Sequence, residues 1–421
     1  MARFCNESRP MVKNQWDADG LTVHCTDAGS AGMFICVTVT EPILKTTHRT
    51  TTARQMYDAI AALLADKRAV LVHERAFASV AYANELMMAR RQAFSAHGID
   101  PDTPLSVIQG QPTWGEGIAG ALLHAMPASV AQVETLRIHA TPVGRSWSTA
   151  TNDYLVLQLD GMTGQASSAD AHGLRLQADS LFDMTATLLA ERGFAFSNVA
   201  RTWFYIRDIL QHYRTFNAVR DNTYARFGLM PKPPAPIWLP ASTAIRGAPT
   251  NGAALIGDIL AVKAANQIPV ERLSNPGQKE AFDYGAAFAR AALIQERDVD
   301  VIQVSGTASI GEDGTTLYPD DGAAQIACTL DKLEALLATA SARLDHVVTA
   351  NVFVKDAALI KLFHTIAKQR GLCNFPGVPV VADVCRDDLL FEIDAEVVVP
   401  KSATAIKQKE ALAAVSGGDA R

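Results

Sequence analysis

The spacing of apolar and polar residues changes in the same order in three successive segments of the chain. Short runs that alternate or are continuously apolar, typical of strands, flank longer segments with apolar residues at helical spacing. These groups cover residues 21–142, 145–263 and 290–400. Each group predicts the order ββαβαββ, a small sheet with two helices on one face, which places the chain in the α+β class.

Residue spacing indicates that the three groups are internal repeats. Gln177 precedes Val199 by 22 residues in the second group, and Gln325 precedes Val347 by the same interval in the third. A helical segment of the first group also aligns without a gap with one of the second, MYDAIAALLADKR with LFDMTATLLAERG. Agreement in both spacing and element order predicts three copies of one module.

The last predicted strands carry the strongest candidate chemistry. Residues 375–399 read as a β-hairpin around the polar turn 386–388. Cys385 stands at this turn, and Glu392 follows seven residues later among apolar neighbours. Burial would raise the pKa of the Glu392 carboxyl and let it donate a proton at neutral pH. The other interpretation is that Glu392 lies on the solvent-exposed face of a strand in which apolar and polar residues alternate.

Composition limits the kinds of partner and compartment. A chain of 421 residues with 48% hydrophobic and 19% charged residues is typical of a globular protein of two or three domains, and its net charge of −6 does not favour nucleic-acid binding. The six cysteines form no CxxC pair, which favours a reducing cytoplasm over a disulfide framework. Without a long apolar run or a signal-peptide pattern, we expect no membrane association.

Motifs for bound metals and nucleotides are missing from the sequence. The histidines show no HExxH or paired spacing, so we expect no metal site. The glycine-bearing turns at 115–117 and 306–311 are not followed by GK[ST], so neither is predicted to bind phosphate. We therefore expect an activity without a cofactor.

The third repeat resembles the RidA/YjgF family at four motifs: SGTAS (305–309), Gln325, VFVKD (352–356) and FEIDA (391–395). Members of this family form trimers of one such domain, with active sites in the clefts between neighbours. The resemblance therefore implies a pseudo-trimeric barrel with helices outside. RidA enzymes hydrolyse imines and enamines with an arginine fifteen residues before the glutamate that matches Glu392. This position is Gly377 here, which speaks against that activity.

Residues 145–400 resemble the chorismatases, RidA-like enzymes that hydrolyse chorismate with loss of pyruvate. Their motifs appear in order as R-x-W-x-Y at 201–205, Y-R-x-F-x-x-x-R at 213–220, P-A-x-T-A-I at 240–245 and N-P-x-Q…Y-G…F-x-R-A within 275–291. The first repeat matches only weakly, so we expect it to be degenerate.

The chorismatase resemblance implies roles for particular residues. Glu392 would protonate the enol ether of chorismate, and Cys385 stands where chorismatases that form aromatic 3-hydroxybenzoate carry cysteine. A buried structural thiol is the other interpretation of Cys385. Substrate carboxylates require arginines that bind in a bidentate way. The residues expected to bind substrate are Arg201, Tyr205, Tyr213, Arg220, Ala241, Ser242, Ala244, Tyr284 and Arg290.

One strand face within this set has two interpretations. Alternation places Arg201, Trp203, Tyr205 and Arg207 on one side of a strand, either in a polar-aromatic cleft or on a solvated outer face.

Three functions remain open. The chain is a chorismatase-like lyase or hydrolase of secondary metabolism, a RidA-like imine or enamine hydrolase, or a non-catalytic small-molecule-binding protein. In each, the expected partner is a small anionic metabolite, and the chain is a monomeric pseudo-trimer or a weak homo-oligomer.

Overall fold

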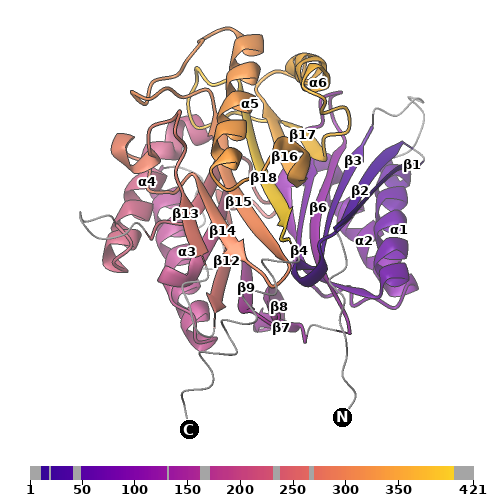
Figure 1. Ribbon diagram of the computed structural model, residues 1–421. Coiled ribbons are helices and arrows are strands. Elements are labelled where there is room, and N and C mark those ends of the chain that lie inside the picture. Colours follow the sequence, from indigo (N-terminus) through magenta and orange to yellow (C-terminus); the bar gives the residue numbers. More distant parts are fainter. Residues whose placement is uncertain are drawn as a thin grey trace.

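Three six-stranded sheets surround a common centre, and the helices lie on their outer sides (Figure 1). The computed structural model describes residues 11–18, 20–40, 49–129, 132–161, 171–230, 238–264 and 270–402. The fold is thus α+β and built from three repeats. No helix of the described residues is long and apolar enough to cross a membrane.

The three repeats share one order of elements. The first contains β1 (Val12–Ala18), β2 (Leu21–Asp27), β3 (Met33–Val39), α1 (Arg49–Lys67), β4 (Ala69–Ala78), α2 (Ala83–Ala96), β5 (Ser106–Gln109) and β6 (Ile118–Pro127). The second contains β7 (Glu134–Ile138), β8 (Thr141–Ser148), β9 (Asn152–Asp160), α3 (Ala171–Glu191), β10 (Val199–Ile206), α4 (Ile209–Arg226), β11 (Ala241–Arg246) and β12 (Leu255–Ala264). The third contains β13 (Val270–Leu273), β14 (Ala291–Gln295), β15 (Val299–Ala308), α5 (Gly322–Ala338), β16 (Val347–Val354), α6 (Leu359–Gln369), β17 (Gly377–Val381) and β18 (Phe391–Pro400).

Each repeat contains the predicted order ββαβαββ, preceded by one further edge strand. β1, β7 and β13 are these extra strands, and each begins before the residue range predicted for its repeat. Two of them are only four or five residues long, and β1 is almost wholly exposed, so their sequences resemble loops. Residues 1–10, before the first repeat, and residues 265–269, between the second and third repeats, lie outside the described residues.

The C-terminal strands do not form the predicted hairpin, and that prediction was wrong. β17 pairs in parallel with β16, whereas β18 runs antiparallel between β15 and β16. β16 therefore separates β17 from β18 in the sheet. The apolar pattern identifies both strands, but the choice of neighbour depends on contacts far apart in the sequence.

Equivalent cation–carbonyl contacts join the repeats head to tail. The strand that follows the first helix of each repeat has an irregular register near its start, which disturbs the regular backbone pairing there. A cation of the next repeat donates to the carbonyl at this point, and repeat one closes the ring on repeat three. The pairs, donor first, are Arg145 to Leu71 (2.8 Å), Arg272 to Val199 (3.0 Å) and Lys13 to Val347 (2.9 Å).

A second ring of contacts closes where the edge strands β5, β11 and β17 end. The backbone N–H groups there donate to carbonyls of a neighbouring repeat, from Gln109 to Ala248, from Arg246 to Asp383 and from Val381 to Gln111. Each sheet nevertheless stays open, so the assembly is a ring of three sheets and not one closed β-barrel.

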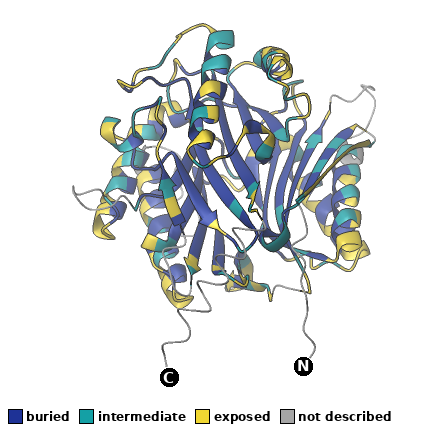
Figure 2. Ribbon diagram, in the orientation of Figure 1, coloured by how far each residue is buried: buried dark blue, intermediate teal, exposed yellow. Residues whose placement is uncertain are grey.

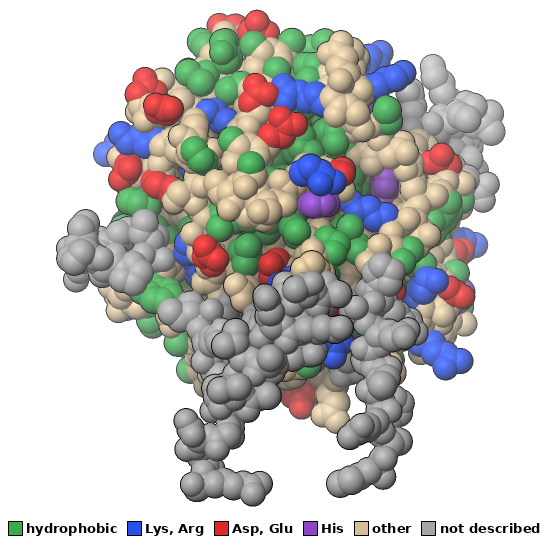
Figure 3. Space-filling view, in the orientation of Figure 1, with side chains coloured by type: hydrophobic (Ala, Val, Ile, Leu, Met, Phe, Trp, Pro, Cys, Tyr) green, Lys and Arg blue, Asp and Glu red, His purple; other side chains and the backbone are tan. Residues whose placement is uncertain are grey.

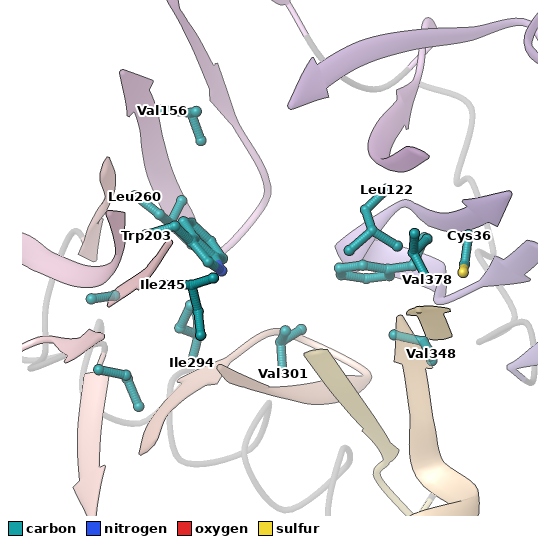
Figure 4. Packing of buried hydrophobic residues seen from close by; sticks show 14 of the residues in the cluster. Cys36, Leu122, Val156, Trp203, Ile245, Leu260, Ile294, Val301, Val348 and Val378 are labelled. Atoms are coloured by element: carbon teal, nitrogen blue, oxygen red, sulfur yellow. The ribbon is translucent and has the colours of Figure 1, made fainter. Parts of the chain in front are cut away.

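Most residues of the strands are buried (Figure 2). On the inner faces, residues from all three repeats meet in one core, in which Trp203, Leu122 and Val378 each represent one repeat (Figure 4). On the outer faces, three separate cores lie between each sheet and its two helices. The surface facing the viewer in Figure 3 intersperses basic and acidic side chains.

Candidate active site

A cavity of about 400 Å³ lies between the second and third repeats. The second repeat contributes α4 and β11 to its wall. The third contributes β15, β18, the short helix Ala281–Tyr284 with the residues that follow it, and the loop between β17 and β18. Such a volume suits a small organic molecule.

Most of the predicted site residues line this cavity. They are Tyr213, Arg220, Ser242, Ala244, Tyr284, Arg290, Cys385 and Glu392. Three do not: Tyr205 and Ala241 belong to the central core, and Arg201 lies beside Trp203 of that core. The strand face that holds Arg201 and Tyr205 is buried, so its interpretation as a solvated surface was wrong.

Glu392 is a buried carboxyl at the floor of the cavity. Only 4% of the residue is exposed, so the interpretation of a solvated strand position was wrong. Burial, reinforced by the charge of Asp394, raises the pKa of Glu392 to about 8, although Arg201 and Arg290 oppose the shift. The carboxyl is therefore mostly protonated at neutral pH and can act as an acid.

A glycine makes room for this carboxyl. The register of β15 against β18 shifts between Val304 and Thr307, and Gly306 lies within the shift. A Cβ atom at Gly306 would lie 2.1 Å from Oε1 of Glu392. The backbone of β15 and the side chain of Glu392 thus share a space that no larger residue allows.

Two buried arginines border the same cavity. Arg220 donates to Asn217 (2.9 Å), while its Nε and Nη1 have no hydrogen-bond partner among the described residues. Arg290 donates to the Tyr284 hydroxyl (2.9 Å), and its Nε likewise has no partner there. Both guanidinium groups lie over the ring of Phe288, at 5.7 and 5.5 Å. Unpaired buried cations are costly, so this arrangement favours the binding of an anion.

Cys385 lies in the cavity wall as a neutral thiol. Burial and the neighbouring Glu392 raise the pKa of the thiol to about 12, although a hydrogen bond with Tyr213 acts in the opposite direction. At neutral pH it therefore acts as a weak hydrogen-bonding group and not as a thiolate nucleophile.

Asn217 and Arg386 are two of the further wall residues that sequence reasoning did not identify. Asn217 fixes Arg220, and its position four residues after Tyr213 on α4 was a usable signal. Arg386 donates to the Gly314 carbonyl (2.8 Å) and lies 5.1 Å from the Tyr284 ring. No local pattern distinguishes Arg386 from an ordinary turn residue, because its partners come from distant segments.

The position of Glu392 carries a carboxyl in one repeat alone. The register shift near the start of β4, β10 and β16 allows the repeats to be aligned. In each repeat, the residue that corresponds to Glu392 pairs with the sixth residue after the one at which this shift begins. Strand pairing places Gly120 there in the first repeat and Ile256 in the second. The first and second repeats therefore lack this acid at the equivalent strand position.

A different polar cluster joins the first and second repeats. Asp258 is fully buried, lies 2.8 Å from Nε2 of His73 and accepts a hydrogen bond from Ser106 at 2.6 Å. The acid stands between the serine and the histidine, so this order differs from that of a nucleophilic triad. Among the described residues, no group of three or more His, Cys, Asp or Glu side chains could hold a metal ion.

Fold and site together define a three-repeat protein with its candidate active site between the second and third repeats. Residues 285–399 match the family Endoribonuclease L-PSP. A 3-hydroxybenzoate synthase of Streptomyces hygroscopicus is 27% identical over 232 residues, which cover 48% of this chain. The chain spans 64% of that protein's length, less than two thirds.

One solved structure is similar to the whole three-repeat fold. A chorismatase crystal structure superposes with a TM-score of 0.57 at 18% identity, covering 78% of this chain and 93% of that one. The protein YJGH covers 32% of this chain and 100% of its own, at 21% identity and a TM-score of 0.27. The third repeat therefore matches the family Endoribonuclease L-PSP, and the chain is similar to a 3-hydroxybenzoate synthase in sequence and to a chorismatase in fold.

Proposed function

We propose that this chain is an enzyme that acts on chorismate or a related small dicarboxylate, with Glu392 as its general acid. One observation carries the proposal: a buried carboxyl that remains protonated near neutral pH shares a cavity with two buried arginines. The sequence similarity to a 3-hydroxybenzoate synthase supports the same substrate class.

Substrate binding rests on the arginines. Arg220 and Arg290 offer unpaired N–H donors, and a planar guanidinium matches a carboxylate in a bidentate way. Phe288, placed under both groups, gives the ring of the substrate an apolar surface. Ser242 and Ala244 of β11 complete the opposite wall.

The chemical step begins with a proton from Glu392. It passes to the methylene carbon of the enol ether, and the ether carbon becomes an oxocarbenium ion. Water adds to this carbon and returns one proton to the Glu392 carboxylate. The hemiketal then collapses to pyruvate and a ring alcohol, so that one water is consumed for each ether bond broken. A carboxylic acid with a raised pKa is suited to this role.

The proposed role of Cys385 concerns which product is formed. Its neutral thiol lies beside Glu392 and Tyr213. From this position it would assist elimination from the ring, which yields an aromatic hydroxybenzoate and pyruvate without net consumption of water. A small apolar side chain could not provide this assistance.

A single chain contains the complete cleft, since both walls come from its own second and third repeats. This supports a monomeric pseudo-trimer. Five cysteines of the described residues are free, in accord with the reducing cytoplasm that we propose as its location. A place in secondary metabolism is part of the same proposal.

Purified protein incubated with chorismate tests the function through release of pyruvate. Pyruvate formation by the wild type, lost in Glu392→Gln, supports the proposal. Ammonia release from an imine substrate without pyruvate from chorismate would instead identify an imine hydrolase. Saturable chorismate binding without turnover would identify a binding protein.

A further inference from the structure

Three acidic side chains follow one another on the inner face of β18. Glu392, Asp394 and Glu396 alternate along the strand, so their side chains point to the same side, and all are buried. Glu392 borders the cavity, and Asp394 contacts Arg201, which lies beside Trp203 of the central core. Glu396 borders a smaller space among the residues of that core. This row leads from the candidate site into the interior.

The carboxyl of Asp394 is contacted by donors from two repeats. Arg201 of β10 in the second repeat lies 3.3 Å from Oδ2, and the Asn351 side chain of β16 donates to Oδ1 at 2.8 Å. Arg201 itself donates to Thr243 at 2.5 Å and lies 4.7 Å above the Trp203 ring. Only 1% of Arg201 and 2% of Asp394 is exposed, so water screens this pair weakly.

Charged and titratable groups face Glu392 from its own strand and from four other segments. Asp394 lies two residues along the same strand, about 7 Å away by strand geometry. Its negative charge disfavours ionisation of Glu392, whereas Arg201 of β10 and Arg290, which directly precedes β14, favour it. Cys385 of the β17–β18 loop and Tyr213 of α4 face the same carboxyl as neutral groups.

We propose that Asp394, fixed by Arg201 of the second repeat, is a positioning residue that holds Glu392 in its protonated form. The catalytic consequence rests on the proposed function, but the electrostatic relationship does not. This arrangement depends on two repeats, because the third repeat supplies Glu392 and Asp394 and the second supplies Arg201.

Substitutions of the acid Asp394 and of the cation Arg201 should change the proton affinity of Glu392 in opposite directions. Asp394→Asn removes the negative neighbour, so the proton affinity of Glu392 should fall by about tenfold. Arg201→Gln removes the positive neighbour and should raise it, while Arg201→Lys keeps the charge and should leave it close to that of the wild type. Glu396→Gln is the matched control, because it neutralises the next acid of the same face at about twice the distance.

Infrared titration of the full chain without ligand measures this property. The band of the protonated carboxyl is assigned to Glu392 by its loss in Glu392→Gln, and circular dichroism confirms that each variant is folded. The proposal predicts a lower midpoint in Asp394→Asn and little change in Glu396→Gln. An unchanged midpoint in folded Asp394→Asn, or an equal shift in Glu396→Gln, would overturn it.

The two Arg201 variants provide a second test that does not depend on the folding of Asp394→Asn. If Asp394→Asn does not fold, Arg201→Gln must raise the midpoint while Arg201→Lys must not, and any other result overturns the proposal. Pyruvate release from chorismate is measured separately. Wild type that releases no pyruvate but shows these shifts refutes the proposed function and leaves the relationship between Asp394 and Glu392 standing.

Discussion

The carboxyl of Glu392 lies directly against the backbone of Gly306, where an added Cβ would come within 2.1 Å of Oε1. The two residues belong to neighbouring strands, and the register shift in β15 brings them together. The orientation of the proposed acid therefore depends on the absence of a side chain on the next strand.

Gly306→Ala should consequently lower turnover by about 10²-fold, because displacement of an acid by about 1 Å is enough for such a loss. Steady-state kinetics on the authentic substrate measures this. Gly277→Ala is the matched control, since the nearest atom to a Cβ there is 3.9 Å away. Equal activity of Gly306→Ala and wild type would show that the placement of Glu392 tolerates a shift.

The raised pKa of Glu392 predicts how stability changes with pH. The folded protein keeps this proton up to about pH 8, whereas the unfolded chain loses it near the ordinary value of 4.5. Between these values the unfolded state binds fewer protons, so the group destabilises the fold as pH rises, by up to about 1.4 kcal/mol per pH unit.

Glu392→Gln removes this titration, so its free energy of unfolding should increasingly exceed that of the wild type between pH 4.5 and 8. Denaturant unfolding of both proteins across this range provides the measurement. A constant difference at all pH values would contradict a raised pKa in the folded state.

Arg220 gives a prediction that separates binding from folding. Its Nε and Nη1 lack partners among the described residues, so Arg220→Met should leave stability nearly unchanged or raise it. The KM for a dianionic substrate should rise by about 10²-fold, because a charge-assisted bidentate contact is lost. Thermal unfolding and steady-state kinetics test the two halves. Large destabilisation with unchanged KM would assign Arg220 a structural role.

Cys385→Ala tests the control of product. The wild type should form a 3-hydroxybenzoate-like aromatic acid, and the variant should shift toward the non-aromatic dihydroxy acid, since a methyl group cannot assist elimination. Chromatography of the products from chorismate gives the ratio. The same ratio in both proteins would make Cys385 an ordinary buried thiol.

The internal repeat was predictable because its signals are local. Gln177 and Gln325, which the spacing matched, have the same role in the structure. Each accepts a hydrogen bond from the backbone N–H just before the last strand of its repeat, from Ala254 and Leu390 respectively. Helical periodicity and strand patterns likewise reflect neighbours within the same segment.

What could not be predicted depends on contacts between distant segments. Alternation placed Arg201 and Tyr205 on one strand face, but whether this face borders a cleft or the central core depends on the other two repeats. The short edge strands and the separation of β17 from β18 were missed for the same reason. Arg386 is held in the site by its contacts with Gly314 and Tyr284, and neither of these residues is near it in sequence.

Release of pyruvate from chorismate, compared between wild type and Glu392→Gln, tests the central claim most directly. The substitution keeps the shape of the side chain and removes its acidity, so turnover should fall by about 10²-fold or more while the protein remains folded. Equal pyruvate release by both folded proteins would remove Glu392 from the mechanism, and no release by the wild type would contradict the proposed reaction.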